Sequence, residues 1–159
     1  MSRRTRHIGG GAARGSGGPS PLSVTVTRTV RFEEVDALGV MWHGRYASWL
    51  DDGREDLGAR YGIGYLDFLG HGVIVPLKLF NLDFHQPLRY GQAYSIVTEL
   101  SWNEAAVLDY AYRIEDAAGT IMTTASTTQL MLSTAGELLM EQPAFYRNFC
   151  AKWQTGGLP

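Results

Sequence analysis

Two hydrophobic periods follow one another in the first part of the chain. From Ser23 to Phe32, the sequence SVTVTRTVRF alternates valine with threonine and arginine over most of its length, which predicts a strand with one buried face. Further on, apolar residues recur three, four and seven positions apart, at Tyr46, Trp49, Leu50, Leu57 and Tyr61. This spacing predicts one amphipathic helix of about four turns. Gly62 and Gly64 are expected to end it.

After Gly72 the chain is dominated by β-branched and aromatic residues, which favour strands. The segments with this composition are residues 73–84, 93–102, 106–116 and 120–134. Short turns separate them, so we expect antiparallel hairpins. Pro76, near the start of its segment, indicates an edge strand or a bulge, because proline cannot donate to a neighbouring strand. The last segment, PAFYRNFCAKW, has Pro143 at the first helical position and predicts a short helix that caps the fold.

The order of strand, long helix and four antiparallel strands predicts an α+β fold. One helix cannot cover both faces of a sheet of about five strands, so we expect the sheet to curl around it. Such a sheet leaves edge strands and one face uncovered, which favours a homodimer or a homotetramer. Residues 1–21 are rich in Gly, Arg, Ser and Pro. We expect them to form a flexible tail before one domain over residues 22–159.

Composition narrows the class of protein. Four of the 14 basic residues are arginines in the tail, and the other ten stand against 16 acids, so the body of the chain carries a charge of about −6. Nucleic-acid binding usually requires a basic face, so we do not expect it. A single cysteine, Cys150, favours a reducing compartment such as the cytoplasm. No apolar run approaches the roughly 20 residues that span a bilayer, so we expect neither a membrane anchor nor a secretory signal.

One carboxylate stands out between the first strand and the helix, in the segment VDALGVMWHGRY (residues 35–46). Asp36 lies there among apolar residues and is followed by Gly39, His43 and Tyr46. This segment resembles the active-site signature of the 4-hydroxybenzoyl-CoA thioesterase family. Its histidine is similar to that of the branch of acyl-CoA thioesterases associated with the Tol-Pal system. QPLRYGQ (residues 86–92) resembles the strand-linking turn of the same family. The resemblance covers about residues 23–145 and implies the hotdog fold, an antiparallel sheet wrapped around one long central helix.

Thioester hydrolysis needs a group that brings water or a carboxylate to the carbonyl carbon, and donors for the charge that develops on the oxygen. The resemblance implies that Asp36 is the catalytic carboxylate, either a general base or a nucleophile that forms a mixed anhydride. N–H groups at a helix start are natural donors, so the amides of His43, Gly44 and Arg45 are candidates. The alternative for Asp36 is a turn or an N-cap, although seven residues separate it from His43.

The residues after Trp42 leave alternatives open. The His43 ring either orients water or substrate, or packs while only its backbone amide takes part. Gly44 would let the backbone approach the substrate closely. Arg45 replaces an asparagine common in relatives, and it either reaches a phosphate or carboxylate of the substrate or points to water. Tyr46 is a candidate substrate contact, but its spacing suits the helix core better, as does that of Trp49.

Other acids and histidines are also candidates for the chemistry of the site. Asp51 and Glu55 are alternative catalytic acids, because some hotdog thioesterases carry that group on the central helix, but solvent exposure is the simpler expectation on an acidic helix face. His71 and His85 lack the spacing of metal ligands, so we expect no metal and no other cofactor. Cys150 has no histidine near it in the sequence and is expected to pack as a small hydrophobe.

The expected function is hydrolysis of an acyl-CoA thioester, in a dimer or tetramer with the active site at a subunit interface. The turn SWNEAA (residues 101–106) lacks the basic cluster that the hydroxybenzoyl enzyme carries for the CoA phosphates. Lys78, Arg89 or Arg113 from a neighbouring subunit could replace that cluster. A thioesterase acting on an acyl or polyketide chain bound to a carrier protein is the second hypothesis, and a non-catalytic acyl-binding hotdog module is the third.

Overall fold

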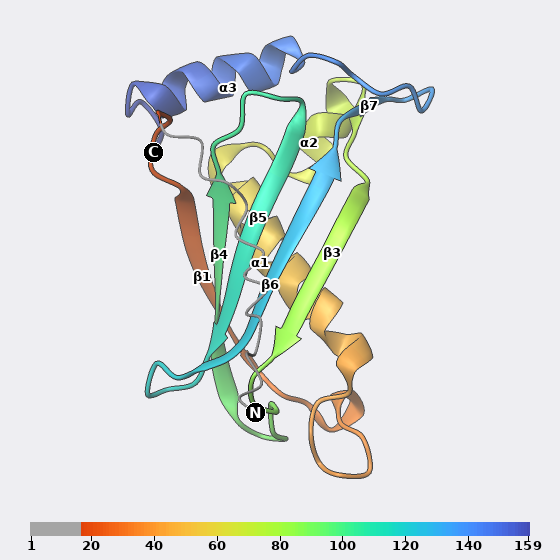
Figure 1. Cartoon of the computed structure of the whole chain (residues 1–159), viewed down its shortest axis with the longest axis vertical. Helices are drawn as coiled ribbons and strands as arrows, with labels where there is room; N and C mark the ends of the chain where they lie inside the picture. Colours follow the sequence, from red (N-terminus) through yellow and green to blue (C-terminus); the bar gives the residue numbers. More distant parts are fainter. Residues whose placement is uncertain (1–16) are drawn as a thin grey trace, which may run out of the picture.

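A five-stranded antiparallel sheet forms the main layer of the computed structural model, which describes residues 17–159 (Figure 1). The strands lie in the order β1-β4-β5-β6-β3. They are β1 (Leu22–Thr29), β3 (Leu77–Phe84), β4 (Ala93–Ser101), β5 (Val107–Glu115) and β6 (Ile121–Leu130). The long helix α1 (Tyr46–Tyr61) runs along one face of this sheet. The predicted α+β class is confirmed, whereas most of the predicted tail over residues 1–21 lies outside the described residues.

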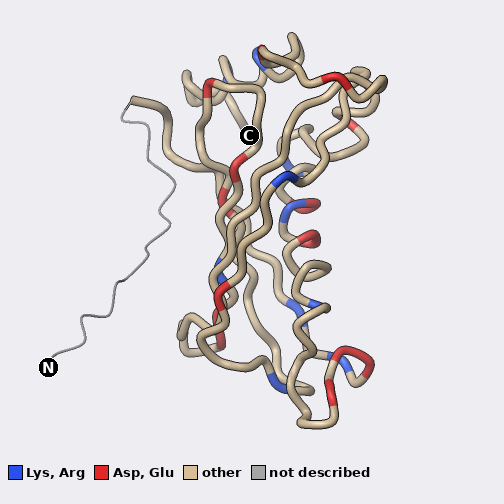
Figure 2. The backbone as a smooth tube through the Cα atoms, turned by 45° about the vertical axis from the view of Figure 1, so that its right-hand side comes forward, with Lys and Arg blue, Asp and Glu red and all other residues tan. Residues whose placement is uncertain are grey.

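α1 forms where the apolar spacing predicted it, because its apolar stripe packs against β1 and β4. Trp49 and Leu50 are fully buried in this interface. Gly53 belongs to the stripe as well, since a Cβ there would lie 2.1 Å from the hydroxyl oxygen of Thr98. The helix ends at Gly62, whose φ of 68° lies in the left-handed region that favours glycine. Charged residues of both signs lie along α1 between the buried ones (Figure 2).

Two predicted strands are interrupted. The strand expected over residues 73–84 is divided at Pro76 into β2 (Val73–Ile74) and β3, because proline has no N–H to continue the ladder. The strand expected over residues 120–134 is divided into β6 and β7 (Leu132–Ser133). β2 and β7 pair with each other in a separate two-stranded sheet, which draws these ends away from the main sheet. The prediction of an edge strand or bulge at Pro76 is confirmed, since β3 is an edge strand with a register shift near its start.

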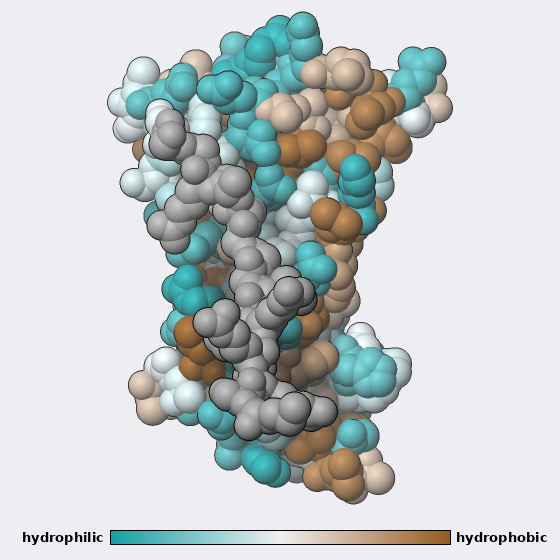
Figure 3. Space-filling model, in the orientation of Figure 1, coloured by the Kyte–Doolittle hydropathy of each residue, from teal (hydrophilic) through white to brown (hydrophobic). Residues whose placement is uncertain are grey.

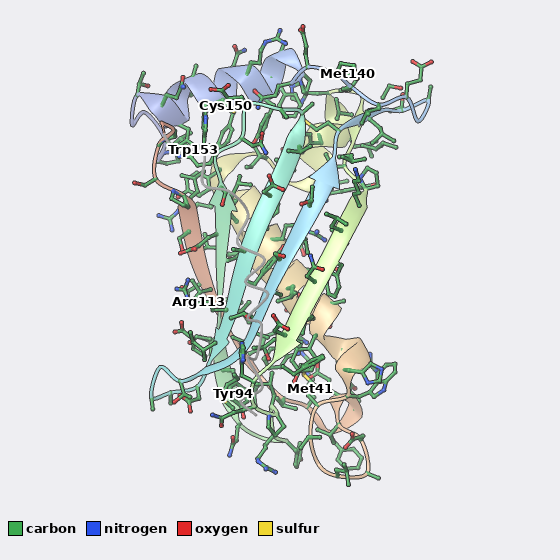
Figure 4. All side chains as sticks on the ribbon, viewed as in Figure 1. Met41, Tyr94, Arg113, Met140, Cys150 and Trp153 are labelled. Carbon is green, nitrogen blue, oxygen red and sulfur yellow. The ribbon has the colours of Figure 1, made fainter. Side chains whose placement is uncertain are left out.

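Two shorter helices, α2 (Tyr65–Gly70) and α3 (Ala144–Gln154), lie at one end of the sheet (Figure 1). α3 is the predicted capping helix, although Pro143 is its N-cap and not its first helical residue. Figure 4 places Cys150 and Trp153 at this end of the molecule and Met41 at the opposite end. The expectation that Cys150 packs as a small hydrophobe is confirmed, because its side chain is buried in the core. Over residues 17–159, no helix has the length and apolar character needed to cross a membrane.

Candidate active site

Asp36 opens a tight turn between the 3₁₀ helix η1 (Phe32–Glu34) and the start of α1. Its Oδ1 accepts a hydrogen bond from the Leu38 amide at 2.8 Å, and its carbonyl accepts one from the Gly39 amide at 3.0 Å. Gly39 has a φ of 73°, a conformation that favours glycine. The exposed Asp36 side chain therefore does form a turn. Because this turn uses one carboxylate oxygen, a turn role and a chemical role are compatible.

A second segment holds this turn in place. The Met41 amide donates to the Leu88 carbonyl at 2.7 Å, and the Tyr90 amide donates to the Gly39 carbonyl at 3.3 Å. Val40 also forms a β-bridge with the residue between these two contacts, Arg89. The two segments singled out in the sequence, 35–46 and 86–92, are therefore neighbours in space.

The start of α1 is preceded by a 3₁₀ turn, η2 (His43–Arg45). No side-chain hydrogen bond caps this start in the described part of the chain, neither from Trp42 nor from Arg45. The Arg45 amide donates to the Trp42 carbonyl at 2.9 Å and is therefore already engaged. The three candidate oxyanion donors are reduced to the amides of His43 and Gly44.

A cavity of about 320 Å³ brings these elements together. It is lined by Asp36, Met41, His43, Tyr46, Phe84, His85, Gln86 and Pro87. The predicted residues Asp36 and His43 thus share one cavity, whose wall includes the first turn of the helix. Its volume falls within the range of small-molecule sites in proteins. Among residues 17–159, no three His, Cys, Asp or Glu side chains are grouped so that they could hold a metal ion.

Tyr46 belongs both to the core and to the cavity wall. Only 2% of the residue is exposed, and its ring packs edge-to-face against Phe84 with 4.8 Å between the ring centroids. Burial raises the pKa of the Tyr46 hydroxyl above its ordinary value, so the phenol is neutral at physiological pH. Trp49 is a core residue, as expected, and its indole Nε1 donates to a Glu34 carboxylate oxygen at 2.9 Å.

His43, Gly44 and Arg45 occupy different surroundings. The exposed His43 ring lies 4.9 Å from the Trp42 ring, measured between centroids. Gly44 is exposed, and a Cβ at this position would lie 2.1 Å from Cζ3 of Trp42, so the tryptophan ring packs where a larger residue would need room. Arg45 is exposed, and its guanidinium donates to the Glu33 carbonyl at 3.4 Å. Neither Gly44 nor Arg45 lines the cavity, and their contact with substrate stays a prediction.

The alternative acids Asp51 and Glu55 lie elsewhere. Both are exposed on α1, as the simpler expectation had it, and Asp51 forms an ion pair with Arg54. They line a second cavity of about 440 Å³, together with Tyr110 and others from the strands. This cavity shares no residue with the one that contains Asp36. Neither acid is therefore grouped with the helix-start amides of its own chain.

His85 also belongs to the site, a role that was not predicted from its position in the sequence. It lines the same cavity as Asp36, and its Nε2 lies 2.9 Å from the Thr124 hydroxyl oxygen. His71, in contrast, stacks on Phe145 with 4.1 Å between centroids. One feature of the sequence indicates this role of His85. This histidine directly precedes QPLRYGQ (residues 86–92), which resembles a turn of the same family as the segment that contains Asp36.

Glu34 is a second residue that the sequence did not single out. It is a buried acid two positions before Asp36, just beyond the segment predicted as the first strand. Burial raises its pKa, but hydrogen bonds from the Arg31 amide and the Trp49 indole, with the charge of Arg28, together bring that pKa below its ordinary value. Glu34 is therefore ionised at neutral pH inside the protein.

Comparison with known proteins identifies the family. The profile of the Thioesterase-like superfamily matches residues 30–148. YneP of Bacillus subtilis (strain 168), described as an acyl-CoA thioesterase, is 26% identical over 126 residues, which cover 79% of this chain and 88% of that protein. The structure of a DHNA-CoA thioesterase from Staphylococcus aureus aligns with a TM-score of 0.75 and 24% identity, over 84% of this chain and 91% of its own. A 4-hydroxybenzoyl CoA thioesterase variant in complex with 4-hydroxybenzoyl CoA aligns with a TM-score of 0.69 and 20% identity, over 80% and 98% of the two chains. The chain therefore belongs to the Thioesterase-like superfamily and has the hotdog fold.

Proposed function

We propose that this protein hydrolyses an acyl-CoA thioester to a carboxylic acid and CoA. The observation that carries the proposal is the cavity shared by Asp36, His43 and the uncapped start of the central helix. A carboxylate that shares a cavity with the start of a helix, where backbone N–H groups act as donors, suits attack on a carbonyl whose oxygen gains negative charge. The description of YneP as an acyl-CoA thioesterase supports CoA as the carrier of the acyl group.

In the proposed reaction, Asp36 acts in one of two ways. As a general base it takes a proton from water, whose oxygen adds to the carbonyl carbon. As a nucleophile it adds to that carbon itself and forms a mixed anhydride, which water then hydrolyses. In both routes the amides of His43 and Gly44 donate to the oxygen that gains charge, and the CoA thiolate leaves and takes up a proton. The His43 side chain orients the water or the substrate.

The finer assignments belong to the same proposal. Gly44, Arg45 and Tyr46 contact the substrate, and the place of Tyr46 in the cavity wall supports the last of these. The histidine at position 43 supports the branch of acyl-CoA thioesterases associated with the Tol-Pal system. The free cysteine Cys150 supports a reducing compartment, and we place the enzyme in the cytoplasm.

Asp36→Asn tests the proposal, because asparagine can keep the turn but not the charge. We expect kcat on acyl-CoA substrates to fall by at least about a hundredfold, measured as release of the CoA thiol. Asp116→Asn is the matched control and should leave kcat unchanged. Asp116 forms a similar turn, accepting from the Ala118 amide at 2.9 Å while its carbonyl accepts from the Gly119 amide at 3.0 Å, but it does not line the cavity.

The outcomes also separate the competing hypotheses. Unchanged turnover in Asp36→Asn would contradict the role of Asp36 and move the chemistry to Asp51 or Glu55. Benzoyl, short-chain and long-chain thioesters of CoA should be compared with the same acyl groups on a carrier protein. A preference for the carrier protein would favour the second hypothesis. A parent protein that binds acyl groups but hydrolyses none of these thioesters would be an acyl-binding module.

We also propose that two copies of the chain pair through β3, either as a homodimer or within a homotetramer. Both β1 and β3 are edge strands, each with a neighbour on one side only. The exposed positions of β1 carry serine and threonine, whereas β3 exposes large apolar side chains at Leu77, Leu79, Phe80 and Phe84. Figure 3 shows apolar surface on the side of the molecule where β3 runs. Because Phe84 also lines the cavity, a partner on β3 would place the active site at the subunit interface.

A further inference from the structure

Glu34 is a buried carboxylate that the proposed reaction does not use. Only 4% of the residue is exposed, and it does not line the cavity of Asp36. Its Oε1 accepts hydrogen bonds from the Arg28 guanidinium and the Trp49 indole, both at 2.9 Å, and its Oε2 accepts one from the Arg31 amide at 2.9 Å. A buried carboxylate is unfavourable unless its charge and lone pairs are satisfied. Three donors at 2.9 Å therefore satisfy the buried carboxylate of Glu34.

The donors come from separate elements of the fold. Arg28 lies near the end of β1, Arg31 directly before η1, and Trp49 in the first turn of α1. The Arg28 guanidinium extends the cluster, because it also pairs with Asp52 of α1 at 2.6 Å and lies 4.9 Å from the centroid of the Trp49 ring. The Glu34 carboxylate therefore ties the end of the first strand to the central helix.

The backbone of Glu34 holds the other end of the same loop. Its carbonyl accepts a hydrogen bond from the Trp42 amide at 2.8 Å. Trp42 directly precedes His43, and Asp36 lies two residues after Glu34. Glu34 thus ends η1 directly before the segment 35–42 and is hydrogen-bonded to Trp42 at the other end of that segment, directly before η2.

We propose that Glu34 is a positioning residue that holds the Asp36 carboxylate in register with the helix-start amides of His43 and Gly44. This inference rests on the proposed function. Glu34 acts through the backbone that carries Asp36 and does not itself touch the substrate. A misplacement of about 1 Å between reacting groups can lower a rate by roughly a hundredfold, so a small shift of this loop is enough to matter.

Glu34→Gln removes the charge and keeps the size of the side chain. We expect kcat to fall between about tenfold and a hundredfold, with the KM of the acyl-CoA changed by less than about twofold. Glu33→Gln is the matched control, because it removes the same charge one position earlier. The Glu33 side chain is 68% exposed, and its one ion pair, from Oε1 to the Arg31 guanidinium, is long at 3.6 Å. It should leave both constants unchanged. A Glu34→Gln protein that is folded and fully active would overturn the proposal.

A double variant distinguishes positioning from a general loss of structure. If Glu34 acts through Asp36, then Glu34→Gln should cost little further activity once Asp36→Asn has removed the carboxylate. Two losses that multiply in the double variant would show that Glu34 works independently of Asp36, and the inference would be wrong.

Amide hydrogen exchange provides a measurement that does not require turnover. Peptides covering residues 35–46 should exchange faster in Glu34→Gln than in the parent, while Glu33→Gln leaves them unchanged. Unaltered exchange would contradict the positioning role even if activity were lost. A parent protein that hydrolyses no thioester would disprove the proposed function and with it the effect of Glu34 on catalysis. The exchange data would still decide whether Glu34 holds the loop.

If Glu34→Gln does not fold, Arg28→Lys takes its place, because lysine keeps the charge but cannot reach Glu34 and Asp52 together as a fork. The same faster exchange is expected in that variant, and unaltered exchange would overturn the inference.

Discussion

Glu34 and Cys150 are both buried, yet their surroundings act on ionisation in opposite directions. Around Glu34, hydrogen bonds and the Arg28 charge outweigh the effect of burial, and the carboxylate stays charged. Around Cys150, burial dominates and raises the pKa of the thiol to about 11, opposed only by a hydrogen bond with Tyr146. The charged group lies beside the candidate active site, where the Glu34 carbonyl accepts a hydrogen bond from the Trp42 amide. The neutral thiol of Cys150 lies at the far end of the molecule (Figure 4). Of these two buried groups, the ionised one is thus the one next to the candidate active site.

The lowered pKa of Glu34 predicts a pH dependence of stability. The native state releases this proton more readily than the unfolded state, whose pKa is near the ordinary value of 4.5. The stabilisation is therefore complete above about pH 4.5 and is lost as the pH falls through the lower native value. We expect the thermal midpoint to drop more steeply on acidification in the parent than in Glu34→Gln, measured by circular dichroism. Parallel pH profiles for the two proteins would contradict this prediction.

Among the elements, α1 can be predicted from local residue spacing, but its packing depends on the sheet. Its apolar period and its glycine end are local features, and both were predicted correctly. Its contact with β4 depends on Gly53, which leaves room for Thr98. The Thr98 hydroxyl is buried and has no hydrogen-bond partner within the described residues. Helix propensity and packing therefore oppose each other at position 53.

Gly53→Ala tests whether helix propensity or packing against Thr98 dominates at this position. Propensity alone would stabilise the helix by up to about 1 kcal/mol, but a Cβ at 2.1 Å from the Thr98 oxygen is an overpacked contact. We expect the free energy of unfolding to decrease by about 1–3 kcal/mol, measured by chemical denaturation. Adding Thr98→Ala removes the oxygen in question and should recover part of the loss. Net stabilisation by Gly53→Ala alone would show that the sheet accommodates the methyl group.

For the molecule as a whole, the two edges of the sheet are unequal. β1 exposes small polar side chains, whereas β3 exposes large apolar ones and ends at Phe84 in the cavity wall. An exposed apolar edge strand readily pairs with another strand. The proposed assembly and the proposed site therefore share one region of the surface.

Leu79→Lys tests this assembly, because a charge on the edge of β3 should prevent strand pairing. We expect the mass in solution, measured by light scattering after gel filtration, to fall toward the 17.6 kDa of one chain. Thr25→Lys, which places the same charge on an exposed position of β1, is the matched control and should leave the assembly intact. An assembly that persists in Leu79→Lys and dissociates in Thr25→Lys would assign the interface to the opposite edge.

The sequence by itself determined the elements and the candidate acid. Alternating and helical periods, turns and helix-ending glycines depend on neighbouring residues, so the strands and α1 could be predicted. A turn at Asp36 was one of two expectations for that residue, and its catalytic role was the one that the family resemblance implied. Only the tertiary structure divided one predicted strand at Pro76 and another into β6 and β7. It also showed that the Arg45 amide is already hydrogen-bonded, placed His85 in the cavity wall, and placed Glu34 beside the segment that carries Asp36. Those features depend on contacts between distant parts of the chain, such as Glu34 with Trp49 and Met41 with Leu88. Local spacing carries no information about such contacts, because the fold of the sheet around α1 creates them.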